Sequence, residues 1–168
     1  MKNNIIIQDT IISKRVTEIA NEINNDYKDI DLDIICLGNS ATRFYESLID
    51  RIKLPFKSHN LKFDNYNSMN VSGEVRLTSD INVPLFNANV LIVEAIVVSG
   101  NTPNYIFKLL QARNPKSLNF CVLGIKPHLL NNKLPLKYVA FELDKRIAVG
   151  YGVGDKCEKK SPHLIEKN

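Results

Sequence analysis

The chain has 168 residues, of which 44% are hydrophobic, with a mean hydropathy of −0.15 and a formal net charge of +4 at pH 7. This length suits a single domain with a sizeable core, and no apolar run approaches the roughly 18 residues that a membrane span needs. The basic excess is mild and lacks interleaved aromatic residues, so we expect no nucleic-acid-binding surface.

The N-terminal stretch MKNNIIIQDT carries one lysine and a three-residue apolar run, which is too little for a signal peptide. Cys36, Cys121 and Cys157 lack the CxxC spacing of a metal site. We therefore expect free thiols in a cytoplasmic protein. The three histidines are scattered along the chain, which favours surface or loop positions over metal binding.

Apolar residues recur at helical spacing over residues 9–26, which predicts an amphipathic helix. DIICL (residues 33–37) predicts a buried strand, and Gly38-Asn39-Ser40 then provides a turn and a helix start. The apolar side chains of residues 44–52 fall on one face of a second helix. Residues 56–62 predict another strand.

Residues 64–73 (DNYNSMNVSG) are polar and without periodicity, so we predict a mobile loop. The strands EVRLT and NVLIVE follow, then a turn, a helix that includes Tyr105 and Leu109, and the strands SLNFCVLGI and YVAFEL. Strands that alternate with helices indicate one α/β domain, residues 1–168, around a mostly parallel sheet.

Residues 98–102 form a turn between a buried strand and a helix, at the sheet edge where such folds bind ligands. Gly100 permits backbone angles that other residues avoid. The turn's amides and the hydroxyls of Ser99 and Thr102 can converge on one phosphate at the positive end of the helix. We call Ser99 to Thr102 the phosphate turn, although the pattern alone also fits a plain capped turn.

Several segments together resemble one family. VLIVEAIVVSGNT (residues 90–102) resembles the phosphoribosyl-pyrophosphate signature of type I phosphoribosyltransferases, in particular the hypoxanthine-guanine phosphoribosyltransferases. NPKSLNFCVLGIKP resembles the strand that ends in the family's purine-contacting lysine, and YVAFELDKRIAVGYGVG resembles its purine-binding segment. DNYNSMNVSGEVRL resembles its flexible catalytic loop. The resemblance implies the type I fold: a central, mostly parallel sheet flanked by helices, with a small hood from the C-terminal region.

Members of this family transfer ribose 5-phosphate from phosphoribosyl pyrophosphate to hypoxanthine or guanine, with Mg²⁺, and release pyrophosphate. They usually associate as dimers or tetramers, so a homo-oligomer is expected. The implied site residues are Ser99, Gly100, Asn101 and Thr102 at the phosphate; Glu94 at the ribose; Lys126 and Ile147 at the purine; Gly38, Asn39 and Lys160 on the pyrophosphate side; Asn65 and Tyr66 in the flexible loop; and Glu94 and Asp155 at the metal.

The chain departs from the family where the chemistry is done. The second of two adjacent ribose-binding acids is Ala95, and the presumed proton acceptor near the purine is Val98. Ile147 replaces a stacking aromatic residue, and Gly154 replaces a metal-side aspartate beside Asp155. Phosphate binding is thus kept while acid-base and metal groups are lost.

Two functions remain open. The chain could bind phosphoribosyl pyrophosphate or a purine nucleotide with weak or lost transferase activity. Alternatively, it is an active, divergent purine phosphoribosyltransferase that makes nucleoside monophosphate and pyrophosphate.

Overall fold

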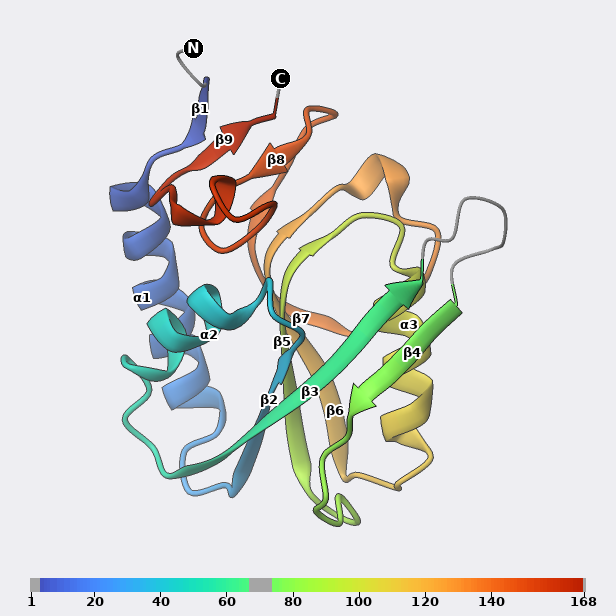
Figure 1. Ribbon diagram of the computed structural model, residues 1–168. Coiled ribbons are helices and arrows are strands. Elements are labelled where there is room, and N and C mark those ends of the chain that lie inside the picture. The colour runs from blue at the N-terminus through green and yellow to red at the C-terminus, as the bar shows by residue number, and fades with distance from the viewer. Residues whose placement is uncertain (1–3, 67–73, 168) are drawn as a thin grey trace.

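The structure, a computed structural model, describes residues 4–66 and 74–167. At its centre is a six-stranded sheet in the order β4-β3-β2-β5-β6-β7 (Figure 1). The strands are β2 (Leu32–Leu37), β3 (Phe56–Tyr66), β4 (Glu74–Ser79), β5 (Asn89–Val97), β6 (Ser117–Ile125) and β7 (Leu136–Glu142). Strands β3, β2, β5, β6 and β7 are parallel, and β4 pairs antiparallel with β3. The predicted α/β class with a mostly parallel sheet is confirmed.

Helices cover both faces of the sheet (Figure 1). Helices α1 (Asp9–Asp26) and α2 (Thr42–Ile49) pack on one face, and α3 (Asn101–Gln111) packs on the other. The α1 bounds agree with the predicted 9–26, and Val16 and Ile19 are fully buried, although Ile11 is 51% exposed. Helix α2 ends earlier than the apolar pattern predicted, and Ile52 is buried beyond its end.

A second, three-stranded sheet forms the hood beyond the carboxyl edge of the central sheet (Figure 1). Its strands, in the order β1-β9-β8, are β1 (Ile5–Ile7), β9 (Leu164–Glu166) and β8 (Ala148–Val149). The hood therefore also takes a strand from the N-terminal end, which the expectation of a purely C-terminal hood missed. Short 3-10 helices η1 (Pro127–Leu129) and η2 (Glu158–Lys160) complete the described fold.

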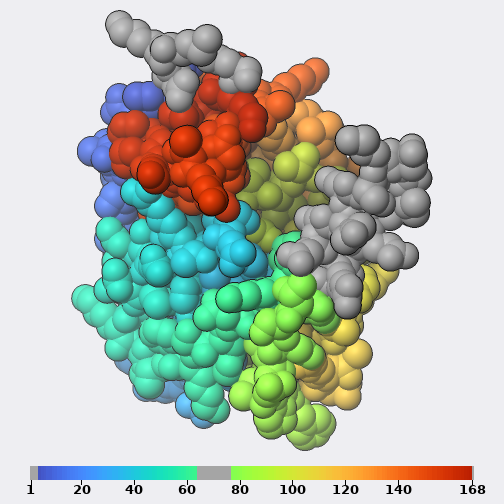
Figure 2. Space-filling view, viewed as in Figure 1, coloured from blue at the N-terminus to red at the C-terminus, as the bar shows by residue number. Residues whose placement is uncertain are grey.

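The hood is fastened to α2, which lies directly beneath the C-terminal segment in Figure 2. The Tyr151 hydroxyl donates to Ser47 Oγ at 2.8 Å, and the Arg43 guanidinium lies 4.9 Å from the centre of the Tyr151 ring. Arg43 also donates to the Ser161 carbonyl at 3.1 Å. These contacts hold the hood over the ends of β2 and β5.

The predicted loop over residues 64–73 is wrong at its start. Asp64, Asn65 and Tyr66 continue β3 and pair with Arg76, Val75 and Glu74 of β4. Polar composition misled the prediction, because this hairpin lies at the sheet edge, where a strand can be polar and still be paired. Residues 67–73 lie outside the described part of the chain.

Within residues 4–66 and 74–167, no helix is both long enough and apolar enough to cross a membrane.

Candidate functional site

A cavity of about 220 Å³ opens at the carboxyl edge of the central sheet. It is lined from the turn after β2, from Phe63 within β3, from β5 and the turn after it, and from the start of α3. Its lining residues are Ser40, Phe63, Glu94, Ile96, Val97, Val98, Ser99, Asn101, Thr102 and Pro103. Because β2 and β5 are parallel neighbours, the two turns predicted at this edge do lie together.

The phosphate turn has the backbone that the sequence predicted. Gly100 has φ +78° and ψ +6°, in the left-handed region, and it caps α3. Its carbonyl accepts from the Asn104 amide at 2.9 Å, which starts the helix, and the Asn101 amide lies 3.4 Å from Ser99 Oγ. Ser99, Asn101 and Thr102 line the cavity, so the positive end of α3 faces it.

Glu94 is the one ionisable side chain among the described residues that line this cavity. It is 7% exposed, and one carboxylate oxygen, Oε1, accepts from the Ala95 amide at 2.7 Å. Burial raises the pKa of Glu94 from 4.5 to about 7, and the hydrogen bond from Ala95 opposes that shift. The carboxyl group therefore exchanges its proton near neutral pH.

Ala95 and Val98, the two positions where the family has acids, differ in their surroundings. Val98 is 42% exposed and lines the cavity. Ala95 is 1% exposed and points into the core cluster beneath α1 and α2. The cavity floor is thus apolar at Val98, and Ala95 lies outside its lining.

The predicted pyrophosphate-side turn follows β2. Gly38 has φ +71°, and its amide donates to the Leu61 carbonyl of β3 at 2.8 Å. The ring of Phe63 lies against Gly38, 3.1 Å from where a Cβ would stand. Asn39 is exposed, and Ser40, rather than either of these two, lines the cavity.

Lys126 is 6% exposed at the end of β6. Its amide donates to the Val97 carbonyl at 3.0 Å, and its ammonium donates to the Arg146 carbonyl at 2.7 Å. That bond ties the Lys126 side chain to the loop between β7 and β8. Ile147, in the same loop, is 60% exposed, and its main-chain carbonyl accepts from the Lys167 amide at 2.8 Å.

Asp155 has a structural task in the hood. Its Oδ1 accepts from the amides of Cys157 at 2.8 Å and Glu158 at 3.0 Å, which caps η2. The hydrogen bond from the Glu158 amide has the largest effect, followed by that from the Cys157 amide, and together they hold the pKa of Asp155 below its usual value. Gly154 has φ +104°, and a Cβ there would lie 2.3 Å from Glu158 Oε2, so the family's aspartate does not fit this backbone. Lys160 is exposed on η2.

Metal ligands do not gather in the described part of the chain. No three His, Cys, Asp or Glu side chains among residues 4–66 and 74–167 come close enough to hold an ion. Glu94 lines the cavity and Asp155 caps η2, so the two acids expected at the metal have different surroundings. Mg²⁺ commonly binds through one or two carboxylates together with substrate phosphates and water.

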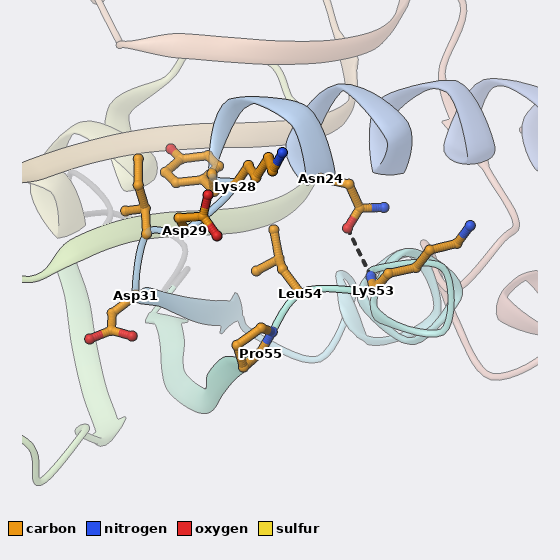
Figure 3. A pocket seen from close by; sticks show the side chains of 9 residues that line it. Asn24, Lys28, Asp29, Asp31, Lys53, Leu54 and Pro55 are labelled. Carbon is orange, nitrogen blue, oxygen red and sulfur yellow. Dashed lines mark hydrogen bonds between the residues drawn. The ribbon is translucent and has the colours of Figure 1, made fainter.

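A larger cavity, of about 630 Å³, lies at the opposite, amino edge of the sheet (Figure 3). It is lined by the end of α1 and by the segments that precede β2 and β3, and Asn24 Oδ1 accepts from the Lys53 amide at 2.8 Å beside it. None of the site residues expected from the sequence lines it. Ligands of parallel sheets bind beyond the carboxyl ends of the strands, so the smaller cavity is the candidate site.

Sequence reasoning missed Ser40, Phe63 and Asn132. Ser40 and Phe63 reach the cavity because β2 and β3 pair in parallel, with Leu37 opposite Leu61. Asn132 bonds to the phosphate turn from 33 residues away, with its Nδ2 3.2 Å from the Ser99 carbonyl. Only the asparagine pair in LNNKL marks that position in the sequence, and such a pair is ordinary loop composition.

Comparison with known proteins points to one family. Residues 4–156 match the phosphoribosyl transferase domain family. The hypoxanthine-guanine phosphoribosyltransferase of Dictyostelium discoideum is 32% identical over 173 residues, covering 99% of this chain and 96% of that protein. The hypoxanthine phosphoribosyltransferase of Buchnera aphidicola subsp. Schizaphis graminum is 32% identical over 152 residues, covering 89% of this chain and 86% of that protein.

Among solved structures, a hypoxanthine-guanine phosphoribosyltransferase from Bacillus anthracis superposes with a TM-score of 0.88 at 26% identity, covering 99% of this chain and 97% of that one. The Trypanosoma cruzi hypoxanthine phosphoribosyltransferase, in complex with the product IMP, superposes at 0.89 with 24% identity, covering 98% and 93%. The predicted fold is confirmed by these superpositions.

Proposed function

This chain belongs to the phosphoribosyl transferase domain family, and from that premise we propose that it binds phosphoribosyl pyrophosphate or a purine nucleotide in the carboxyl-edge cavity. We further propose that its transferase activity is weak or lost. The observation that carries both statements is the make-up of the cavity: Ser99, Asn101 and Thr102 of the phosphate turn line it, and Glu94 is the single ionisable side chain among its described lining residues.

The phosphate turn supports binding. Its left-handed Gly100, the hydroxyl of Ser99 and the start of α3 provide donors and a positive helix end for a phosphoryl group. The cavity of about 220 Å³ is small for a whole nucleotide, so we assign it to the ribose 5-phosphate. The base would then extend toward Lys126 and the loop that carries Ile147.

Lys126 supports recognition of a purine of the hypoxanthine or guanine type. An ammonium group has three N–H donors, and the bond to the Arg146 carbonyl uses one of them. The others are available to a 6-oxo group. Ile147 offers apolar contact to the ring from the same loop.

Val98 supports the loss of turnover. It lines the cavity at the position of the family's presumed proton acceptor, and a valine can neither accept a proton nor form a hydrogen bond. Loss of a general base typically lowers a rate by about 10²–10⁴. Phosphate binding does not depend on that group, so binding and turnover separate.

Magnesium fits only as a companion of the ligand. Glu94 could contribute one carboxylate oxygen, because its other oxygen, Oε1, is taken by the Ala95 amide. The remaining ligands would be phosphate oxygens and water. When bound, the ion would neutralise charge on the pyrophosphate group.

The second candidate is an active, divergent purine phosphoribosyltransferase that makes nucleoside monophosphate and pyrophosphate. One observation favours it: burial raises the pKa of Glu94, within the cavity, to about 7. A carboxylate in that range is a competent proton acceptor at neutral pH. Under this reading Glu94 takes on part of the task that Val98 cannot perform.

We also propose a cytoplasmic location. All three cysteines are free thiols, two of them buried, which suits a reducing compartment.

Two measurements on the same preparation test the proposal. The protein is incubated with phosphoribosyl pyrophosphate, Mg²⁺ and, in turn, hypoxanthine, guanine, xanthine and adenine, and nucleotide is quantified by chromatography. Thermal unfolding is then followed with and without GMP. We expect little or no product, and a rise in the midpoint of about 5–10 °C at a GMP concentration near 100 times the dissociation constant.

Ser99→Ala should reduce that rise, whereas Ser79→Ala, an exposed serine on β4, should leave it unchanged. Rapid product formation by the unaltered chain would establish the second candidate. Absence of stabilisation by GMP and by phosphoribosyl pyrophosphate would overturn the binding proposal.

A further inference from the structure

The segment that follows η1 packs against the back of the phosphate turn. A Cβ built on Gly100 would lie 2.9 Å from Leu130 Cδ1, 3.3 Å from Leu134 Cδ1 and 3.4 Å from Asn132 Cβ. Leu130 and Leu134 also pack on the core cluster beneath α3, so the segment is held at two points. None of these three residues lines the cavity.

Asn132 joins three parts of the turn through its side-chain amide. Its Nδ2 donates to the Ser99 carbonyl at 3.2 Å and to Asn101 Oδ1 at 2.8 Å. Its Oδ1 accepts from Asn104 Nδ2 at 3.1 Å. The network therefore links the residue before Gly100 with the first and fourth residues of α3.

The Ser99 carbonyl receives a second donor from the same segment. The Asn131 amide donates to it at 3.1 Å, beside the bond from Asn132. A carbonyl oxygen has two lone pairs, and these two donors can occupy both. The carbonyl is thereby fixed toward residues 131 and 132.

The orientation of the Ser99 carbonyl also determines the orientation of the Gly100 N–H. The Ser99 carbonyl and the Gly100 N–H belong to one planar trans peptide, so they point in opposite directions. A carbonyl held toward the segment behind the turn turns the Gly100 N–H away from that segment. Ser99 and Asn101, the neighbours of Gly100 in the chain, both line the cavity, whereas Asn131 and Asn132 do not. An N–H turned away from Asn131 and Asn132 is therefore the orientation that suits a phosphoryl group in the cavity.

We propose that Asn132 is a positioning residue for phosphate binding. It holds the Ser99–Gly100 peptide in the orientation that aims the Gly100 N–H at a phosphoryl group, and it fixes Asn101 at the start of α3. The inference rests on the proposed function, because it takes the phosphate turn to be the anion site. It adds a residue that contacts no ligand and acts through the turn.

The test compares GMP with guanosine, which lacks the phosphate, by isothermal titration calorimetry. Asn132→Ala removes the side-chain donor and acceptor, and we expect it to weaken GMP binding about tenfold while guanosine binding changes by less than about twofold. Asn132→Asp keeps the size but replaces the donor with a carboxylate near the phosphate. It should weaken GMP binding by about 100-fold.

Asn131→Ala is the matched control. The Asn131 side chain is exposed, and the substitution keeps the main-chain amide that donates to Ser99. GMP affinity should therefore stay within about twofold of the unaltered chain. Asn104→Ala, which removes only the donor to Asn132 Oδ1, serves if Asn132→Ala does not fold, and it should weaken GMP binding about threefold.

A loss of the same size for GMP and guanosine in Asn132→Ala would show a general structural role and overturn the inference. Unchanged GMP affinity in Asn132→Ala, or in Asn104→Ala where that variant stands in, would overturn it as well. Ser99→Ala separates this result from a failure of the proposed function. If the unaltered chain does not prefer GMP to guanosine, or Ser99→Ala keeps the preference, the phosphate assignment itself is wrong.

Discussion

Val98→Asp and Ala95→Asp both reinstate an acid near the cavity, yet the structure predicts opposite outcomes. Val98 is 42% exposed at the cavity, where an aspartate can stay hydrated and reach a ligand. Ala95 is 1% exposed inside the core cluster that faces α1 and α2. Val98→Asp should therefore raise transferase activity, and Ala95→Asp should mainly destabilise the fold.

The expected magnitudes differ widely. At Val98, an exposed substitution changes the free energy of unfolding by about 0.5 kcal/mol or less, while a restored general base is worth about 10²–10⁴ in rate. At Ala95, a carboxylate buried without a partner costs about 3–5 kcal/mol. That is a large part of the roughly 5–15 kcal/mol by which a domain is stable.

The assay measures initial rates of nucleotide formation from hypoxanthine and phosphoribosyl pyrophosphate with Mg²⁺, and urea unfolding by circular dichroism. Val98→Asn and Ala95→Asn are size-matched controls without the carboxylate. A Val98→Asp rate no higher than that of Val98→Asn would refute our account of the missing proton acceptor. An Ala95→Asp chain as stable as Ala95→Asn would refute the burial argument.

Three further predictions concern Glu94, Gly100 and Asp155. Burial raises the pKa of Glu94 from 4.5 to about 7. Between these two pH values the folded state therefore retains a proton that the unfolded state has released. The free energy of unfolding should then fall by about 3 kcal/mol as pH rises through this range. Glu94→Gln should remove this pH dependence when stability is measured by urea titration; the same dependence in the variant and the unaltered chain would contradict the assignment. Gly100→Ala should cost about 2–5 kcal/mol, from a left-handed φ and the contact with Leu130, and should weaken GMP binding in calorimetry; an unchanged urea midpoint would argue against both. Asp155→Ala should lower the thermal midpoint by uncapping η2 and leave the Mg²⁺ dependence of ligand binding unaltered, so a changed Mg²⁺ dependence would instead identify Asp155 as a metal ligand.

The elements that the sequence predicted well are those with a strong apolar period. Helix α1 follows the spacing of Val16, Ile19 and Ile23, and the continuous burial of β2 matches DIICL. The start of the phosphate turn was predictable because Gly100 marks a left-handed residue between a strand and a helix. In each case the signal lies within a few neighbouring residues.

The errors arise where structure depends on distant pairing. Strand β1 exists because Ile5 pairs with Ile165, a relation that no local pattern reveals. Asn65 and Tyr66 are in a strand because β4 returns beside them. The metal-side role expected for Asp155 stays a prediction. Its carboxylate caps η2, and a cap of one short turn is not separable in sequence from a free loop acid.

The site residues also divide into those that the sequence could locate and one that it could not. The turn pattern located Ser99 and Thr102, the family resemblance located Glu94, and all three line one cavity. Their roles toward ligand remain predictions. The resemblance says nothing of Asn132, because its bonds depend on how the segment after η1 lies over the turn.

Under the proposed function, this arrangement gives a physical reason why binding would persist without the catalytic groups. The segment that begins at Lys126 bonds to the end of β5 twice, through the Lys126 amide to the Val97 carbonyl and the Asn131 amide to the Ser99 carbonyl. It carries Lys126 at one end and Asn132 at the other, so under the proposed function one frame would set both the purine and the phosphate positions. That frame consists of main-chain and amide bonds together with packing by Leu130. None of those bonds involves the side chains of Ala95 or Val98, so the replacement of two acids can remove proton transfer while the frame stays intact.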